Sequence, residues 1–172
     1  AWSPLSTKYL PPSRSTPSIA DHATQCERWI CAPWTGLYLF HIDSAKADLD
    51  EVLYRRAKHV VTENQRTQNA ARALEQNNIQ KFSRLMAESH ASLRDDFEVT
   101  LPEFDTLVEI VSQVIGERGG IRMTDGCVVA LVDHELTDAV VAAVEHEFFE
   151  KTAIDATVYL CSASAGAGRI DN

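Results

Sequence analysis

The segment from Met86 to Val108 constrains the fold more than any other part of this 172-residue sequence. Apolar residues at spacings of three and four lead into it and predict an amphipathic helix: Ile79, Phe82, Leu85 and Met86. The helical pattern breaks at Arg94-Asp95-Asp96, which we interpret as a turn because short polar side chains satisfy turn backbone. The segment therefore predicts two helices joined by a sharp connection.

A capped start and a clean apolar face mark the second of these helices. Thr100 and Glu103 have the spacing of a capping box, and Pro102 fits the first helical turn. The predicted buried face consists of Phe104, Leu107, Val108, Val111, Val114 and Ile115. Gly116 is the expected C-cap.

The segment on the N-terminal side of this pair predicts a long helix. Leu49, Val52, Leu53, Ala57, Val60 and Val61 share one helical stripe, while Arg55, Arg56, Lys58 and Glu63 fall mostly away from it. The helix is expected to stop near Asn77-Asn78, with Asn78 as the N-cap of the following helix.

The hydrophobic period changes to two after Gly116. Ile121–Thr124 and Cys127–Val132 read as strands joined by Asp125-Gly126, a pair suited to a two-residue hairpin turn. Asp133 is expected to cap another helix, whose inward residues list as Leu136, Val140, Ala143, Val144 and Phe148. Residues 156–161 predict a final strand. This order of elements indicates an α+β fold in which helices pack on one face of a small antiparallel sheet.

The first 44 residues differ in composition from the rest. They hold all three tryptophans and five of the six prolines. We therefore divide the chain into an irregular Pro/Ser/Trp-rich leader, 1–44, and a folded domain, 45–172. Residues 1–20 are expected to be irregular or extended, and residues 35–42 are the best strand candidate there. The change of composition also fits a truncated or shifted reading frame.

Charge and hydropathy exclude several classes of function. The formal net charge of −9 disfavours nucleic acids and anionic membrane surfaces. No apolar run reaches the roughly 20 residues of a membrane helix, and no signal peptide is visible. Cys26, Cys31, Cys127 and Cys161 have no paired metal-ligand spacing, so reduced thiols in a cytoplasmic protein are expected.

Three clusters invite a chemical interpretation, and each has a structural one that we prefer. Ser89 and His90 are neighbours on a helix, so their side chains diverge by about 100° and cannot form a nucleophile–base pair. Asp95-Asp96 reads as a turn rather than a general base. His146 and its two flanking glutamates do not converge as metal ligands would. The residues therefore predict no catalytic group and no metal site.

Several segments resemble the galactokinases, a branch of the GHMP family of small-molecule kinases. The resemblance lies in residues 54–64, 86–108, 119–124 and 126–132, and it is closest to bacterial galactokinases of the enterobacterial type. It covers roughly residues 48–168, the C-terminal half of that family, and implies its ferredoxin-like C-terminal domain. It also implies ATP and Mg²⁺ as cofactors, galactose as substrate, galactose 1-phosphate as product and a cytoplasmic location. In that family a strand from the preceding part of the chain completes the sheet, and residues 36–42 are the expected substitute.

One family motif falls inside this resemblance. The galactokinase pattern Arg-Met-Thr-Gly-Gly-Gly-Phe-Gly-Gly-Cys corresponds here to Arg122, Met123, Thr124, Asp125, Gly126 and Cys127, four residues shorter. These six residues are the candidate remnant of a substrate and phosphate loop. Glycines let a backbone approach a ligand closely, whereas an aspartate repels a triphosphate by about 1 kcal/mol or more in a partly buried site.

The other two galactokinase motifs have no counterpart in this sequence, and neither has the catalytic aspartate with its arginine partner. The leading hypothesis is therefore a galactokinase C-terminal domain that is not active alone. The alternative is a non-catalytic module that dimerises or binds the missing kinase half through a sheet edge. A remnant without function is a third hypothesis.

Overall fold

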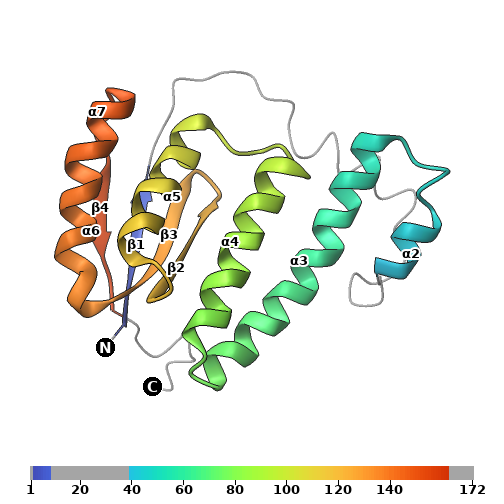
Figure 1. The fold of residues 1–172 in the computed structure, drawn as a ribbon. Helices are drawn as coiled ribbons and strands as arrows, with labels where there is room; N and C mark the ends of the chain where they lie inside the picture. Colours follow the sequence, from blue (N-terminus) through green and yellow to red (C-terminus); the bar gives the residue numbers. More distant parts are fainter. Residues whose placement is uncertain (1, 9–38, 163–172) are drawn as a thin grey trace, which may run out of the picture.

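The computed structural model describes residues 2–8 and 39–162 (Figure 1). The helices lie beside and in front of a single sheet, and α3 and α4 extend away from it on one side (Figure 1). Among the described residues, no helix combines the length and the apolar character needed to cross a membrane.

Twelve elements make up the described fold. In chain order they are β1 (Trp2–Lys8), α2 (Leu39–Ser44), α3 (Glu51–Glu75), α4 (Ile79–Asp95), α5 (Pro102–Ile115), β2 (Gly119–Thr124), β3 (Cys127–Asp133), the 3₁₀ turn η2 (His134–Leu136), α6 (Thr137–Ala143), the π-helical η3 (Val144–Phe148), α7 (Phe149–Thr152) and β4 (Thr157–Leu160). From α6 to α7 the helical segments follow one another without a break. The predicted α+β class and the order of elements after residue 45 are confirmed.

The sheet has four antiparallel strands in the order β2-β3-β1-β4. Thr124 pairs with Cys127, so β2 and β3 form the predicted hairpin with Asp125 and Gly126 as its two-residue turn. Gly126 has a φ of 71°, the left-handed conformation that glycine adopts without strain.

The strand that completes the sheet is β1, and this corrects the sequence prediction. Residues 35–42 were the expected strand, but Leu39–Ser44 form the helix α2, and 35–38 lie outside the described residues. The segment expected to be irregular or extended supplies β1 instead. Pro4 lies where β1 pairs only with β3, because pairing with β4 begins at Leu5. A proline is tolerated most easily where one side of a strand has no partner.

The main core lies between the sheet and the helices α5, α6 and η3. Its members alternate along the strands and repeat at helical spacing along the helices. They are Phe104, Leu107, Val108, Ile110, Val111, Ile115, Ile121, Met123, Val128, Ala130, Val132, Val140, Val144 and Phe148. The predicted faces of both helices supply most of them. Ile110, only 1% exposed, is the buried α5 residue that the pattern did not include.

Helix α4 covers the outer edge of the sheet, and α3 packs against α4 as an antiparallel hairpin (Figure 1). Asn78 caps α4 as predicted, because its Oδ1 accepts a hydrogen bond from the Lys81 amide at 3.0 Å. The Asp50 carboxylate caps α3 in the same way, accepting from Leu53 at 2.9 Å. These caps satisfy amides that the helices leave unpaired.

The predicted capping box at the start of α5 is wrong. The N-cap is Leu101, which has no side-chain cap, and Pro102 is the first helical residue. Thr100 is therefore one position too early for its hydroxyl to reach the expected amide, and it donates to Asp105 Oδ2 at 3.3 Å instead. Gly116 ends α5 with a φ of 51°, as expected of a glycine C-cap.

Candidate functional site

The six residues of the shortened motif do not form one cradle. Within β2, the Arg122 side chain faces the α3–α4 hairpin and the Met123 side chain belongs to the main core, whereas Asp125 and Gly126 are exposed at the tip of the turn. Thr124 and Cys127 face each other across the ladder. The backbone at this point is a connection between strands, and it does not make the wide loop that a glycine-rich phosphate site needs.

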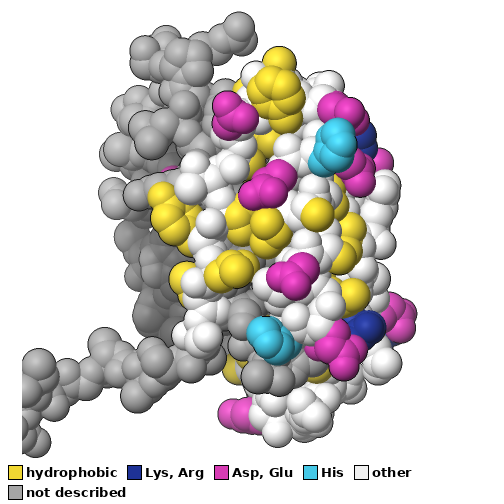
Figure 2. Space-filling view, turned by 90° about the vertical axis from the view of Figure 1, so that its left-hand side faces the viewer, with side chains coloured by type: hydrophobic (Ala, Val, Ile, Leu, Met, Phe, Trp, Pro, Cys, Tyr) yellow, Lys and Arg dark blue, Asp and Glu magenta, His cyan; other side chains and the backbone are white. Residues whose placement is uncertain are grey.

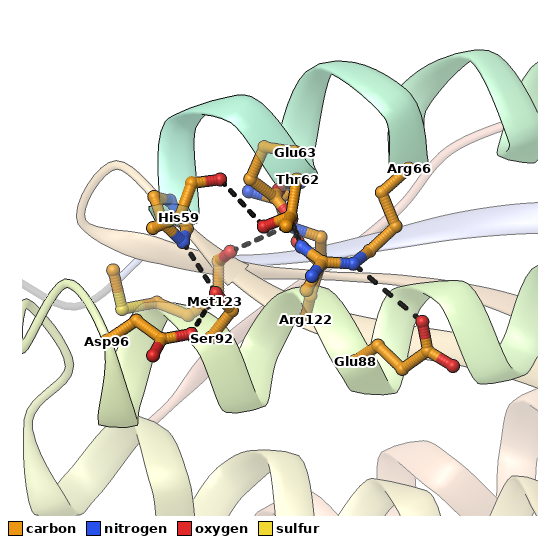
Figure 3. A network of polar contacts seen from close by, with 10 residues as sticks. His59, Thr62, Glu63, Arg66, Glu88, Ser92, Asp96, Arg122 and Met123 are labelled. Atoms are coloured by element: carbon orange, nitrogen blue, oxygen red, sulfur yellow. Dashed lines mark hydrogen bonds and ion pairs between the residues drawn. The ribbon is translucent and has the colours of Figure 1, made fainter. Parts of the chain in front are cut away.

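Arg122 belongs instead to a polar cluster formed by α3, α4 and β2 (Figure 3). Its Nε donates to the Met123 carbonyl at 3.0 Å, and its Nη1 lies 3.6 Å from Glu63 Oε2. Glu63 Oε1 pairs with Arg66, and Oε2 accepts from the Ser89 hydroxyl at 2.6 Å. The Glu63 carboxylate thus accepts hydrogen bonds from donors on two helices, while Arg122 lies at a longer distance.

A hollow of about 190 Å³ lies beside this cluster. Its walls come from α3, α4 and β2. The lining residues are Glu63, Arg66, Thr67, Ala70, Phe82, Leu85, Met86, Ser89 and Arg122. Burial lowers the pKa of both Arg66 and Arg122 from the usual value. Two partly desolvated guanidinium groups and one carboxylate therefore face a concave, partly apolar space.

His90 closes the edge of the sheet. Its Nδ1 accepts a hydrogen bond from the Met123 amide at 3.3 Å, and its Nε2 lies 3.2 Å from Asp105 Oδ1. Burial lowers the pKa of His90, and nearby Asp105 opposes that shift. The backbone bond requires an unprotonated Nδ1, so the neutral ring with a proton on Nε2 fits both contacts. His90 therefore has a structural role: its ring accepts the hydrogen bond from a β2 amide that the carbonyl of a neighbouring strand would otherwise accept.

A second buried chain of polar groups joins α3 to the end of α4. His59 Nδ1 lies 2.9 Å from Ser92 Oγ, and the Ser92 hydroxyl donates to Asp96 Oδ2 at 2.8 Å (Figure 3). Burial is the largest cause that lowers the pKa of His59, to about 4. Because the Ser92 proton is directed at a carboxylate and not at the imidazole, this chain does not generate a nucleophile.

The other clusters singled out in the sequence have structural roles. Ser89 and His90 do not pair with each other, as predicted, because each bonds a different element. Asp95 is the last residue of α4, and its hydrogen bonds from Arg94 lower its pKa. The His146 side chain is 81% exposed and lies 3.6 Å from Glu150. Within residues 2–8 and 39–162, no three His, Cys, Asp or Glu side chains gather where a metal ion could bind.

Sequence reasoning missed the hollow because the charged residues that line it come from segments far apart in the chain. Glu63 was placed away from the buried face of α3, yet its side chain is only 18% exposed. The signal that could have found it is the spacing 63, 66, 67 and 70, which faces 82, 85, 86 and 89 in an antiparallel helical hairpin.

The fold and the family comparison define the class of this protein. Residues 70–151 match the family model described as "GHMP kinases C terminal", and this part of the chain is a GHMP kinase C-terminal domain. The match spans α4, α5, the β2–β3 hairpin and nearly all of the helix that ends with α7.

Among the GHMP kinases, the structure is similar to that of Lactococcus lactis galactokinase complexed with galactose. The TM-score is 0.81 at 30% identity, over 98% of this chain and 47% of that protein. The structure of L. major mevalonate kinase in complex with R-mevalonate has the same fold, with a TM-score of 0.56 at 17% identity over 96% of this chain and 44% of that protein. The chain thus spans about half the length of both relatives, and the galactokinase resemblance in its sequence is confirmed.

Proposed function

We propose that this chain is the C-terminal domain of a galactokinase, an enzyme that transfers the γ-phosphoryl group of ATP to galactose, and that it does not catalyse the transfer alone. The observation that carries the second part is the β2–β3 connection. Thr124 and Cys127 are direct cross-strand partners, so only Asp125 and Gly126 remain in the turn. The similarity to Lactococcus lactis galactokinase supports the first part.

The physical argument concerns ATP and Mg²⁺, the cofactors that the family implies. A phosphate cradle needs several backbone amides turned toward the ligand, usually in a glycine-rich loop or at a helix N-terminus. The turn here has one glycine, and the exposed Asp125 carboxylate adds charge of the same sign as the phosphates. The residues present in 122–127 therefore do not fit a triphosphate, and no step of phosphoryl transfer is assigned to them.

We further propose that residues 45–172 are the C-terminal domain proper and that residues 1–44 contribute β1 to its sheet. A strand contributed by the preceding part of the chain is what the family resemblance implies. We place the protein in the cytoplasm, in the galactose catabolism of the cell, on the same resemblance.

Galactose-dependent formation of ADP tests the proposal. The chain is expressed in a host that lacks galactokinase and assayed with magnesium-ATP, beside an intact galactokinase and a reaction without galactose. We expect no galactose-dependent turnover. Turnover in that host would show that the chain builds a complete site and would overturn the proposal.

A chimera tests the galactokinase identity itself. Residues 2–162, which include β1, replace the matching half of Lactococcus lactis galactokinase, once with the native turn and once with the glycine-rich galactokinase sequence between Thr124 and Cys127. We expect the second chimera to phosphorylate galactose and the first to be at least about 100-fold slower, in line with the loss of backbone donors at a developing charge. A folded but inactive second chimera would contradict the assignment.

A non-catalytic module that pairs through its sheet is the second candidate, and the β4 edge favours it. Tyr159 and Leu160 are 51% and 57% exposed on this edge strand, and Phe149 on the neighbouring helix is 50% exposed. Figure 2 shows hydrophobic side chains at the surface on this side of the molecule, among carboxylates. An exposed strand edge binds further strands, from a second copy or from the missing kinase half. Size-exclusion chromatography across concentration, with and without intact galactokinase, decides; a strict monomer that ignores the kinase counts against it.

A further inference from the structure

The hollow between α3, α4 and β2 has a charged end and an apolar end. On α3 the lining runs from Glu63 and Arg66 to Ala70, and on α4 it runs in the opposite direction from Phe82 to Ser89. Because the two helices are antiparallel, Glu63 lies opposite Ser89, with 2.6 Å between Glu63 Oε2 and Ser89 Oγ, and Ala70 lies toward the Phe82 end. The space therefore has the polarity of a small amphipathic molecule.

Among the residues that line the hollow, positive charge exceeds negative charge at the charged end. Arg66 and Arg122 face the single carboxylate of Glu63, and their side chains are 15% and 34% exposed. Glu88 lies 3.8 Å from Arg66, but its side chain is 62% exposed and solvated. A monoanion at this end would balance the excess, whereas a dianion would repel Glu63.

Arg122 supplies the donors for such an anion. Its Nε bonds the Met123 carbonyl, and its contact with Glu63 is too long, at 3.6 Å, for a good hydrogen bond. Within the described residues, no other hydrogen bond uses its remaining N–H groups. The remaining N–H groups of a guanidinium can bond the two oxygens of a carboxylate.

The apolar end of the hollow determines the size and the apolar character of the rest of the ligand. Ala70, Phe82, Leu85 and Met86 supply its walls. The volume of about 190 Å³ exceeds the roughly 150 Å³ in which an apolar protein cavity holds benzene. A sugar phosphate or a nucleotide would place hydroxyl groups or a second charge against these walls without partners, at a cost in affinity.

We propose that this hollow binds a small organic monocarboxylate, with the carboxylate on Arg122 and a compact apolar body between Phe82 and Met86. The site is separate from the hairpin turn and from the kinase proposal. It uses a side chain of the shortened motif for a purpose other than phosphate binding.

Binding of benzoate to the full chain, measured by isothermal titration calorimetry at pH 7, tests the proposal. Benzamide has the same shape without the charge, and inorganic phosphate has the charge without the apolar body. We expect saturable binding of benzoate at millimolar or lower concentration, and at least about tenfold weaker binding of both comparison compounds. Equal binding of benzamide, or no saturation with benzoate up to 50 mM (roughly the weakest affinity of interest), would overturn it.

Two variants and one matched control locate the site. Arg122→Gln removes the charge and should weaken benzoate binding about tenfold or more. Ala70→Leu fills the apolar end and should do the same without touching a charge. Arg84→Gln removes an exposed arginine that does not line the hollow, so benzoate affinity should stay within about twofold. Circular dichroism checks that each variant is folded; if Arg122→Gln is not, Ala70→Leu decides alone, and unchanged binding there would refute the site.

Discussion

Acidification from pH 7 to pH 5 should destabilise this domain through His59. The imidazole is 7% exposed, packs against the Phe97 ring at 4.9 Å and bonds Ser92. Burial lowers its pKa from 6.5 to about 4, with Arg66 and Arg122 acting in the same direction and Asp96 opposing. The folded protein therefore keeps this histidine neutral under conditions where the unfolded chain already binds a proton.

The sign and size of the effect follow from proton linkage. A histidine whose folded pKa is depressed contributes its full stability above the unfolded pKa, and the contribution is lost as pH falls toward the folded pKa. With values of 6.5 and about 4, His59 costs about 2 kcal/mol of unfolding free energy between pH 7 and pH 5. Below pH 4 the loss levels off at about 3 kcal/mol.

Urea unfolding followed by circular dichroism at 222 nm measures this, because most of the described chain is helical. His59→Gln keeps a donor for Ser92 but cannot titrate, so its stability should fall by about 2 kcal/mol less than that of the wild type between pH 7 and pH 5. His146→Gln, at an exposed position, is the matched control and should follow the wild type. Parallel pH dependences for the wild type and His59→Gln, within about 0.5 kcal/mol (the usual additivity error), would refute the reasoning.

Three further predictions concern stability. Gly119→Ala should be severely destabilising, by more than about 3 kcal/mol, because a Cβ there would lie 2.3 Å from the Leu131 carbonyl oxygen. Gly120→Ala should cost less, since the atom nearest to its added Cβ is the sulfur of a flexible side chain. Equal melting temperatures for the two variants would contradict this difference. Asn78→Ala should lower the unfolding free energy by about 1 kcal/mol through loss of the α4 cap. Thr100→Ala should cost less than half of that, because no helix amide depends on its hydroxyl; a larger effect in urea unfolding would restore the capping box.

Local patterns in the sequence were sufficient for the helices α3 to α6 and for the hairpin, but not for α2, where a strand was expected. The apolar spacing of α5 and the Asp125-Gly126 turn each depend on residues close together in the chain, and both predictions are confirmed. The capping box failed for a local reason: Pro102 takes the first helical position, which leaves Thr100 outside. A shift of one residue is enough to remove the interaction.

Long-range pairing is the part that the sequence could not predict. Trp2–Lys8 carries a proline and two serines and has little of the alternation that marks a strand, and its place in the sheet comes from the backbone of β3 and β4. The charged end of the hollow likewise needs Arg122 beside Glu63, which lies far away in the chain. The shortened motif was visible from the sequence, but the new surroundings of Arg122 were not.

The position of β1 in the sheet determines when this domain can become complete. About 120 residues separate Lys8 from Cys127, its partner on β3. At typical rates of synthesis, β1 is made roughly 6 to 25 s before that partner is made. Helices α3 to α5 depend on near neighbours and can form in that interval, while closing so long a loop is the slow, entropically costly step. Until that step, the β2–β3 hairpin and β4 have an open place between them that any extended strand in the cell could occupy.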